Sequence, residues 1–447
     1  MDLAQRMIAP ADLQDPATFS QGIPHAAFAE MRARPQLSWT PPSGGDRTGF
    51  WSVTRHGSVS EVSRDTDLYS SAVGHIQIYD IDSDALPARA SMIDLDPPVH
   101  TRLRRLVSSA FTPRHVQSYE SAVRSRIAAR LDALVRAGGG DWVEAVAAPI
   151  PIGVICDIMG VPESDHDYMI ELTDHLVAGT SSKPLEPTAY GNTTDLRLLP
   201  FNSPAAHGIN EYARALGERR RAEPADDLVT KLIEAEVDGE RLTDAEFTNF
   251  FRLMVFAGNE TTRASMAHLA LHLVDFADQF ERVRADPSLM AQAAEEVIRY
   301  SSPILYFRRT LTRDTVLQGT PLFAGDKVVM WYAAANFDED VFDEPIRFDV
   351  TRPLRPPNVA FGGGGAHFCL GAPLARLELA VLIEAILSRG IELRLAGDPV
   401  YVDSNFVNGI EHLEVEVRGR ATRSASPAHT GEAVARAARE RSERERE

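Results

Sequence analysis

The stretch Phe361–Gly371, FGGGGAHFCLG, places four consecutive glycines in front of a single cysteine. Consecutive glycines form no stable regular structure by themselves, and they let the main chain approach a flat object closely. The residues after Gly371 predict a helix, because Pro373 suits a first helical turn and a small or apolar face begins at Leu374. Cys369 is therefore expected beside a helix N-terminus, in a loop rich in free N–H groups. Both features favour the thiolate over the thiol.

An activated thiolate at Cys369 can serve as a nucleophile or as a metal ligand. His367 is a possible base, but two residues so close in sequence rarely aim both side chains at one substrate. A structural zinc site takes four ligands, usually as two spaced pairs, and the other cysteine, Cys156, lies alone in an apolar stretch that indicates core. A haem iron needs one thiolate in a glycine-lined loop. The simplest alternative, a buried free cysteine, leaves the entropic cost of four glycines unexplained.

The stretch resembles the haem-binding loop of the cytochrome P450 family, in which a Phe-Gly-rich loop followed by His-x-Cys-x-Gly carries the proximal thiolate. One extra residue separates Phe361 from Cys369 compared with the commonest form of that loop. This longer variant resembles an actinobacterial branch that acts on sterol side chains, methyl-branched lipids and isoprenoids. The resemblance covers nearly the whole chain, from about residue 10 to residue 418.

The resemblance implies a mainly α fold with a small β-rich side (α+β), with haem b held between a long central helix and the cysteine loop. We expect residues 1–418 to form a single haem-thiolate monooxygenase domain. Residues 419–447 are rich in Arg, Glu, Ala and Ser and contain no aromatic residue. They are expected to be disordered or at most a marginal solvated helix.

Composition excludes several classes of protein. The chain has 447 residues with 44% hydrophobic and 25% charged residues, as in ordinary soluble globular proteins. Its net charge of −18 disfavours nucleic acid and anionic membranes as partners. Two cysteines make no disulfide framework, and we find no signal peptide and no membrane anchor, so we expect a cytoplasmic location. No flavin or ferredoxin domain is fused, and the family resemblance therefore implies electrons from NAD(P)H through a ferredoxin reductase and a ferredoxin.

A basic helix is expected from His100 to Phe111, after the break at residues 96–98. His100 and Arg104 lie four positions apart and hence on one face. A solvated basic face is the simpler interpretation, and we adopt it for Arg102 and Arg105, which we expect to meet an acidic ferredoxin. For the other two residues the family resemblance implies binding of a haem propionate. It implies cofactor contacts at Cys369, His100, Arg104, Arg309, His367, Gly258, Ala257, Phe361 and Gly371, with Arg308 the less favoured register for Arg309.

A capping box, Thr243 to Glu246, predicts the start of a long central helix that runs past His268. The segment Ala257–Thr262 is expected to interrupt it, because a mid-helix glycine costs about 1 kcal/mol and two threonines can bond back to preceding carbonyls. A tolerated packing glycine is the alternative. The family resemblance implies an oxygen-binding groove here, in which Thr261 holds a proton for dioxygen and Glu260 feeds protons through water.

Glu296 and Arg299 form a Glu-x-x-Arg pair, which by spacing alone is an ordinary helical ion pair. The family adds a second arginine, which we assign to Arg352. We interpret these three residues as structural.

Residues 70–92 and 178–206 are two long irregular segments, and such loops in a compact domain are usually functional or disordered. The family resemblance implies that the first is the substrate-entry loop and that the second is the mobile region over the active site. It also implies that residues 406–409 form a hairpin tip that reaches the substrate pocket. The predicted pocket is apolar and is formed by Phe256, Leu305, Phe307, Phe406 and Val407.

The sequence therefore predicts a haem-thiolate monooxygenase that hydroxylates an unactivated C–H bond of a hydrophobic substrate, such as a sterol side chain, a branched lipid or a terpenoid. Two alternatives remain: a peroxide-driven peroxygenase, and a haem-binding sensor or carrier without turnover. The pair Glu260 and Thr261 argues against both, since related peroxygenases lack it and mere binding needs no proton relay.

Overall fold

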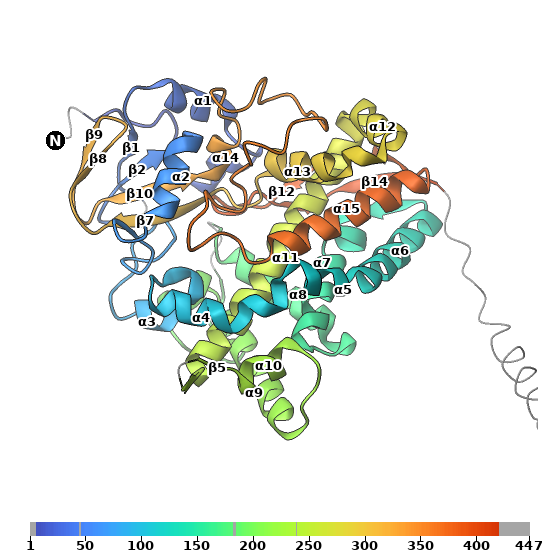
Figure 1. Cartoon of the computed structure of the whole chain (residues 1–447), viewed down its shortest axis with the longest axis horizontal. Helices are drawn as coiled ribbons and strands as arrows, with labels where there is room; N and C mark the ends of the chain where they lie inside the picture. The colour runs from blue at the N-terminus through green and yellow to red at the C-terminus, as the bar shows by residue number, and fades with distance from the viewer. Residues whose placement is uncertain (1–5, 44–45, 182–184, 238, 420–447) are drawn as a thin grey trace, which may run out of the picture.

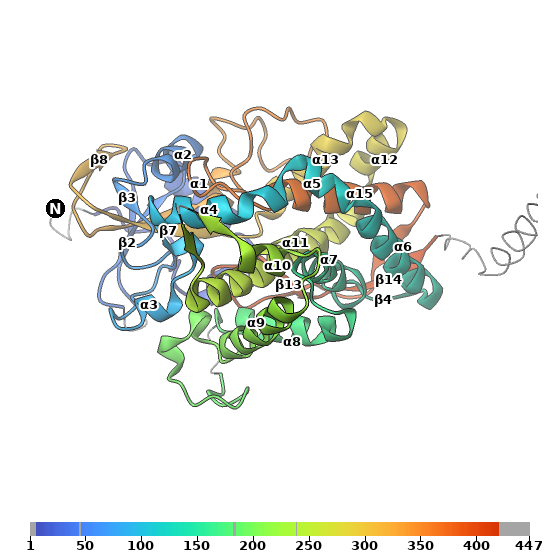
Figure 2. The same cartoon turned by 60° about the horizontal axis from the view of Figure 1, so that its bottom comes forward.

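The computed structural model of the chain describes residues 6–43, 46–181, 185–237 and 239–419. Strands β1, β2 and β7 lie at the N-terminal end of the molecule, and α6 and β14 lie at the opposite end, beyond the long helix α11 (Figure 1 and Figure 2). The α-helices are α1 His25–Ala33, α2 His56–Arg64, α3 Leu86–Arg89, α4 Val99–Ser108, α5 Pro113–Ser118, α6 Glu120–Ala137, α7 Pro149–Met159, α8 His166–Ala178, α9 Ala205–Ala222, α10 Leu228–Glu234, α11 Asp244–Asp275, α12 Ala277–Ala285, α13 Met290–Ser301, α14 Tyr332–Ala335 and α15 Ala372–Ser388.

The largest sheet has the strand order β1-β2-β10-β7-β3. Its central pair is antiparallel, with Val328 of β10 opposite Arg309 of β7, and β10 runs parallel to β2. All residues of β10 are buried, which agrees with its unbroken run of apolar residues after Lys327. The strands are β1 Ser38–Thr40, β2 Phe50–Val53, β3 Tyr69–Ser70, β4 Gly139–Asp141, β5 Glu236–Val237, β6 Glu240–Arg241, β7 Tyr306–Leu311, β8 Thr315–Leu317, β9 Thr320–Leu322, β10 Lys327–Trp331, β11 Glu392–Leu395, β12 Val400–Tyr401, β13 Ile410–His412 and β14 Glu414–Arg418. The expected mainly α fold with a small β-rich side is confirmed.

The central helix α11 begins at the expected capping box. Thr243 Oγ1 accepts from Glu246 N at 3.2 Å, and Glu246 Oε2 accepts from Thr243 N at 2.9 Å. The helix continues without a break to Asp275, so the expected interruption at Ala257–Thr262 is wrong. The Thr261 hydroxyl donates to the Ala257 carbonyl one turn earlier, while the backbone hydrogen bonds of the helix stay intact.

Proline and glycine positions explain smaller differences from the expected elements. Residues 144–159 read as one amphipathic helix from the sequence, but they form a π-helical turn, Val143–Ala147, followed by α7, which begins at Pro149. A proline has no N–H to donate and is therefore favoured at a first helical position. Cys156 in α7 is fully buried, as expected. No helix in the part of the chain that the structure describes is long and apolar enough to cross a bilayer. The prediction for residues 419–447 lies, except for Gly419, outside the described ranges.

Candidate active site

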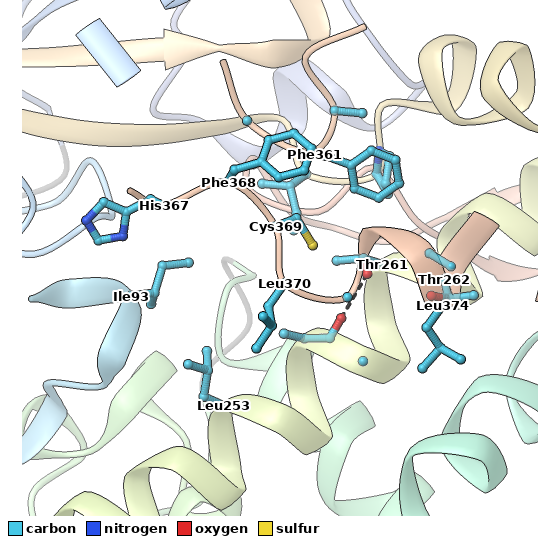
Figure 3. A pocket seen from close by; sticks show the side chains of 18 of the residues that line it. Ile93, Leu253, Thr261, Thr262, Phe361, His367, Phe368, Cys369, Leu370 and Leu374 are labelled. Carbon is cyan, nitrogen blue, oxygen red and sulfur yellow. Dashed lines mark hydrogen bonds between the residues drawn. The ribbon is translucent and has the colours of Figure 1, made fainter. Parts of the chain in front are cut away.

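The cysteine loop joins the end of the irregular segment after α14 to helix α15. The Cys369 N–H donates to the Phe361 carbonyl at 3.0 Å, which closes the loop on itself. The Leu374 N–H donates to the Gly371 carbonyl at 2.9 Å and starts the helix. Figure 3 shows the Cys369 sulfur directed into a cavity, on the side where Thr261 and Thr262 of α11 lie.

The glycine run packs against another helix as well as lining the site. A Cβ on Gly363 would lie 2.8 Å from Ser60 Cα, and one on Gly365, where φ is +80°, would lie 2.7 Å from the Ser63 carbonyl oxygen. Both contacts are with α2, and neither glycine is among the residues that line the cavity. Close approach to a flat cofactor therefore explains only part of the run, at Gly362. The middle of it is explained by close packing on α2.

The cavity between the loop, α4, α11 and α15 has a volume of about 1370 Å³, its open mouth included. Most of the exposed wall is apolar. The expected site residues that line it are Cys369, His100, Arg104, His367, Phe361, Gly371, Ala257, Gly258, Thr261 and Phe307.

The Cys369 thiol is less acidic here than the sequence suggested. The Cys369 side chain is exposed at the cavity wall, but the surrounding protein desolvates the sulfur and raises its pKa, while the N–H groups of Gly371 and Ala372 and the charge of Arg104 lower it and do not prevail. Donors beside the sulfur are thus present as expected, but desolvation outweighs them. A metal ion on the sulfur would reverse this balance, because a coordinating thiol loses its proton outright.

Cationic and imidazole side chains gather at one edge of the cavity. The rings of His100 and His367 lie 4.2 Å apart, and Arg104 Nη2 donates to the Phe368 carbonyl at 2.6 Å. Arg309 is 1% exposed and lies outside the lining residues, but its charge helps to lower the pKa of His367 to about 2, after burial, the larger cause. Burial and the Arg104 charge likewise lower the pKa of His100 to about 4.

This edge is short of negative charge. His100 Nδ1 and Arg309 Nε are buried without a hydrogen-bond partner. Within the described ranges, neither Arg104 nor Arg309 forms an ion pair. Arg308, the alternative register, is instead held by the Tyr79 carbonyl at 3.2 Å and Thr310 Oγ1 at 3.1 Å. Carboxylates entering at this edge would meet unpaired donors, so the residues present fit a haem whose propionates point here.

On α11, Thr261 and Glu260 face different surroundings. Thr261 lines the cavity, and its Oγ1 donates to the Ala257 carbonyl at 2.8 Å. Glu260 is 4% exposed, lies outside the lining residues and accepts from Asn259 Nδ2 at 3.2 Å. Burial raises the pKa of Glu260 to about 7, although Arg263 at 3.5 Å opposes the shift. A proton could pass between the two residues only through water.

Gly258 is both a packing glycine and part of the wall of the cavity. It lines the cavity, and a Cβ there would lie 2.9 Å from Ile155 Cγ1 of α7. The helix pair α7 and α11 therefore packs closely at the point where α11 borders the cavity.

A second cavity of about 650 Å³ adjoins the first and shares Thr261 and Phe307 with it. Phe256 and Phe406 line it as expected. Leu305 and Val407 line neither cavity: each is 1% exposed within the core. The strand β7 begins only at Tyr306, and Leu305 packs into the core just before it. Lining residues that the sequence reasoning missed include Ile304, Leu253 and Phe201.

The three residues interpreted as structural lie together. Arg299 donates to both carboxylate oxygens of Glu296, and Arg352 Nε lies 3.2 Å from the same carboxylate. Arg299 Nη1 also donates to the Asn336 carbonyl at 2.7 Å. Asn336 Oδ1 in turn accepts from the N–H of Val359, just before the cysteine loop, at 2.7 Å. The cluster thus holds the segment that leads into the loop.

The two arginines expected to meet a ferredoxin differ from one another. Arg102 is half-buried and pairs with Glu246, the capping-box acid of α11, so it is not a free surface charge. Arg105 is exposed and forms no ion pair with any residue that the structure describes.

Comparison with known proteins identifies the family. The family model described as cytochrome P450 matches residues 20–389. The chain belongs to the cytochrome P450 family. This cytochrome P450 is 36% identical over 425 residues to a steroid C26-monooxygenase of Mycolicibacterium smegmatis, covering 93% of this chain and 96% of the relative. It is 40% identical over 397 residues to a methyl-branched lipid omega-hydroxylase of Mycobacterium bovis, covering 87% and 90%.

Solved structures agree with this assignment. A Mycobacterium marinum cytochrome P450 in complex with pseudoionone superposes with a TM-score of 0.81 at 38% identity, covering 92% of this chain and 99% of that one. A second cytochrome, from Novosphingobium aromaticivorans, gives a TM-score of 0.81 at 31% identity, covering 93% and 100%. The cytochrome P450 described here is therefore a monooxygenase that uses haem iron and O2, hydroxylates hydrophobic C–H bonds and needs redox partners. This interpretation is favoured over a peroxygenase or a non-catalytic haem protein.

Proposed function

We propose that this cytochrome P450 hydroxylates a methyl-branched lipid, a sterol side chain or a terpenoid, with electrons from NAD(P)H through a ferredoxin reductase and a ferredoxin. The proposal rests on one arrangement: the Cys369 sulfur and Thr261 lie on the wall of the same largely apolar cavity. The names of the two relatives support the lipid classes, and pseudoionone in the related structure supports the terpenoid class. The cytoplasmic location stays a prediction.

Each site residue then has a defined task. Cys369 would hold the iron, and His100, Arg104, His367 and Arg309 would hold the haem carboxylates. When bound, the haem supplies the activation of dioxygen and the oxidation of the C–H bond. Ala257, Gly258, Phe361 and Gly371 would shape the walls around the haem.

The protein's own part in the reaction is to exclude water and to hold protons. Phe256, Phe307 and Phe406 keep the substrate cavity apolar. Thr261 Oγ1 would present a proton toward the cavity instead of toward the Ala257 carbonyl. Glu260, whose raised pKa of about 7 lets it carry a proton near neutral pH, would resupply that hydroxyl through one water.

A substrate screen tests the proposal. Branched fatty acids, sterols and terpenoids are titrated into the haem-loaded protein while the low-spin to high-spin shift of the Soret band is recorded. We expect a shift with at least one class, and a hydroxylated product that requires NAD(P)H, ferredoxin and reductase together. Product formed equally well from hydrogen peroxide alone would instead support the peroxygenase alternative.

A further inference from the structure

The exposed wall of the second cavity is almost entirely apolar, but ionisable side chains line its end away from the first cavity, since none of them lines the first. Four ionisable side chains line that end, two cationic, one acidic and one imidazole. His100, Arg104 and His367 are absent from its lining, although the charge of Asp94 acts on Arg309 at the edge that fits the haem propionates. The four residues are His75, Arg89, Asp94 and Arg252.

Arg252 is the unusual member of the group. It projects from α11 and is 3% exposed, and among the described residues its one hydrogen bond runs from Nη1 to Asn210 Oδ1 at 2.9 Å. No carboxylate among the described residues lies within ion-pair distance of it. Burial lowers its pKa to about 10, which still leaves it charged at neutral pH. A buried charge without a partner is costly, and proteins keep one mainly where a ligand completes the pair.

The acid in this group is already engaged. Asp94 Oδ2 accepts from Ser91 N at 2.9 Å and from Ser91 Oγ at 2.8 Å. Asp94 Oδ1 lies 3.0 Å from His75 Nε2. These contacts hold the carboxylate in place, and it acts on Arg252 only from a longer distance.

The second cation, Arg89, adds to the positive field. It is held by Tyr79 Oη at 2.7 Å and by Asn202 Oδ1 at 3.1 Å, and its Nε is buried without a hydrogen-bond partner. Two guanidinium groups and one carboxylate therefore line this end of the cavity. The net charge of these three groups is positive.

We propose that this end of the cavity binds the carboxylate of a lipid substrate, with Arg252 as the anchor and Arg89 as a second donor. The inference rests on the proposed hydroxylase function and narrows its substrate class to lipid acids. A bidentate guanidinium–carboxylate pair would give Arg252 its missing partner. The apolar body of the acid would then lie along Phe256 and Phe406 toward Thr261.

The geometry also selects the carbon that is oxidised. Arg252 and Thr261 are nine positions apart on α11, which corresponds to about 13.5 Å along the helix axis. A carboxylate held at Arg252 therefore keeps the carbons beside it away from Thr261. The end of the chain remote from the carboxylate reaches the oxidising side of the site.

The test compares a methyl-branched long-chain fatty acid with its methyl ester, which has the same apolar body and no charge. Binding to the haem-loaded protein is measured by calorimetry and by the spin-state shift. We expect the wild type to bind the acid about 10- to 100-fold more tightly than the ester, the range for a hydrogen bond to a charged group. Arg252→Gln should remove this preference and leave ester binding unchanged, while Arg252→Lys should keep part of it. Arg313→Gln, at an exposed site, is the control.

Three results separate the possible failures. Equal wild-type affinity for acid and ester, which needs no variant, overturns the carboxylate subsite and leaves the hydroxylase function intact. An equal loss of acid and ester binding in Arg252→Gln also overturns it, because Arg252 would then only support the wall. Binding of neither lipid, in protein that shows the thiolate-haem spectrum, overturns the proposed lipid substrates and the subsite together.

Discussion

Arg299 donates from Nε and Nη2 to the two carboxylate oxygens of Glu296, at 2.8 Å each, and neither side chain is more than 2% exposed. Removing one partner would leave an uncompensated buried charge, which costs about 3–5 kcal/mol. We expect Glu296→Gln to lower the thermal unfolding midpoint strongly and to reduce haem retention, since the cluster holds the segment before the cysteine loop. The matched control is Glu281→Gln, which breaks an exposed pair of the same spacing with Arg284 and should cost less than about 1 kcal/mol. Similar losses in both variants would contradict the structural role.

Cys369→Ala should abolish the strongly red-shifted Soret band of the reduced carbon monoxide complex, because only the thiolate ligand produces it. Cys156→Ala should keep the band, since that thiol is fully buried in α7 and burial raises its pKa. An imidazole-type spectrum in the wild type would refute the assignment of Cys369.

Thr261→Val tests whether the hydroxyl serves oxygen chemistry or only the helix. The variant keeps the side-chain shape and loses the donor that now reaches the Ala257 carbonyl. We expect it to bind haem and substrate and to consume NAD(P)H, but to yield several-fold less product and correspondingly more hydrogen peroxide. Glu260→Gln should instead slow the whole cycle, because it removes the proton source. If Thr261→Val still converts NAD(P)H consumption into product as efficiently as the wild type, the Thr261 hydroxyl has no part in oxygen chemistry and only bonds to the helix.

Glu378, on α15, makes stability depend on pH. It lines the first cavity, is 1% exposed, and its Oε2 has no hydrogen-bond partner. Burial raises its pKa from 4.5 to about 8. Between pH 4.5 and 8 the folded protein therefore binds more protons than the unfolded chain. The stabilising contribution of the Glu378 carboxyl to folding is full below pH 4.5 and is lost as the pH rises through 8.

Glu378→Gln should accordingly become more stable relative to the wild type as the pH rises from 6 to 9, by about 2–3 kcal/mol. Denaturant unfolding of the haem-loaded proteins at both pH values measures this difference. Glu384→Gln, on the same helix and half-exposed, should show no such trend. A pH-independent difference for Glu378→Gln would mean that its carboxyl is ionised in the folded protein.

Arg105→Glu should slow reduction by the ferredoxin several-fold at low salt and weaken its salt dependence, because surface charge mainly sets encounter rates. Substrate binding should not change. Arg102→Ala should act mainly on stability, through the loss of its pair with Glu246. Stopped-flow reduction at two salt concentrations separates these effects, with Arg221→Glu on α9 as the control. Equal reduction rates for Arg105→Glu and wild type would show that the ferredoxin does not dock on the face of α4 that carries Arg105.

The parts of the site that the sequence predicted depend on short-range patterns. The spacing of His100 and Arg104 places both on one helical face, and both line the cavity. The spacing of Glu296 and Arg299 gives the ion pair directly. The order of residues around Cys369 places the sulfur between a loop and a helix.

The parts that it did not predict depend on contacts between distant segments. Nothing near Gly363 in the sequence indicates that α2 packs against it. The cavity role of Arg252 requires knowing that no acid from another element reaches it. The balance at Cys369 depends on how far the surrounding elements desolvate the sulfur at the cavity wall, and a motif does not report this.

Ser63 and Gly364 are 301 residues apart in the chain, yet the Ser63 hydroxyl donates to the Gly364 carbonyl at 2.8 Å. During synthesis the N-terminal segments leave the ribosome first, so α2 exists long before the glycines that pack against it. Closing so long a loop has an entropic cost that only the nearly complete fold offsets. The cysteine loop can therefore take its final packing on α2 only after nearly the whole chain that follows α2, up to the glycine run, has been synthesised.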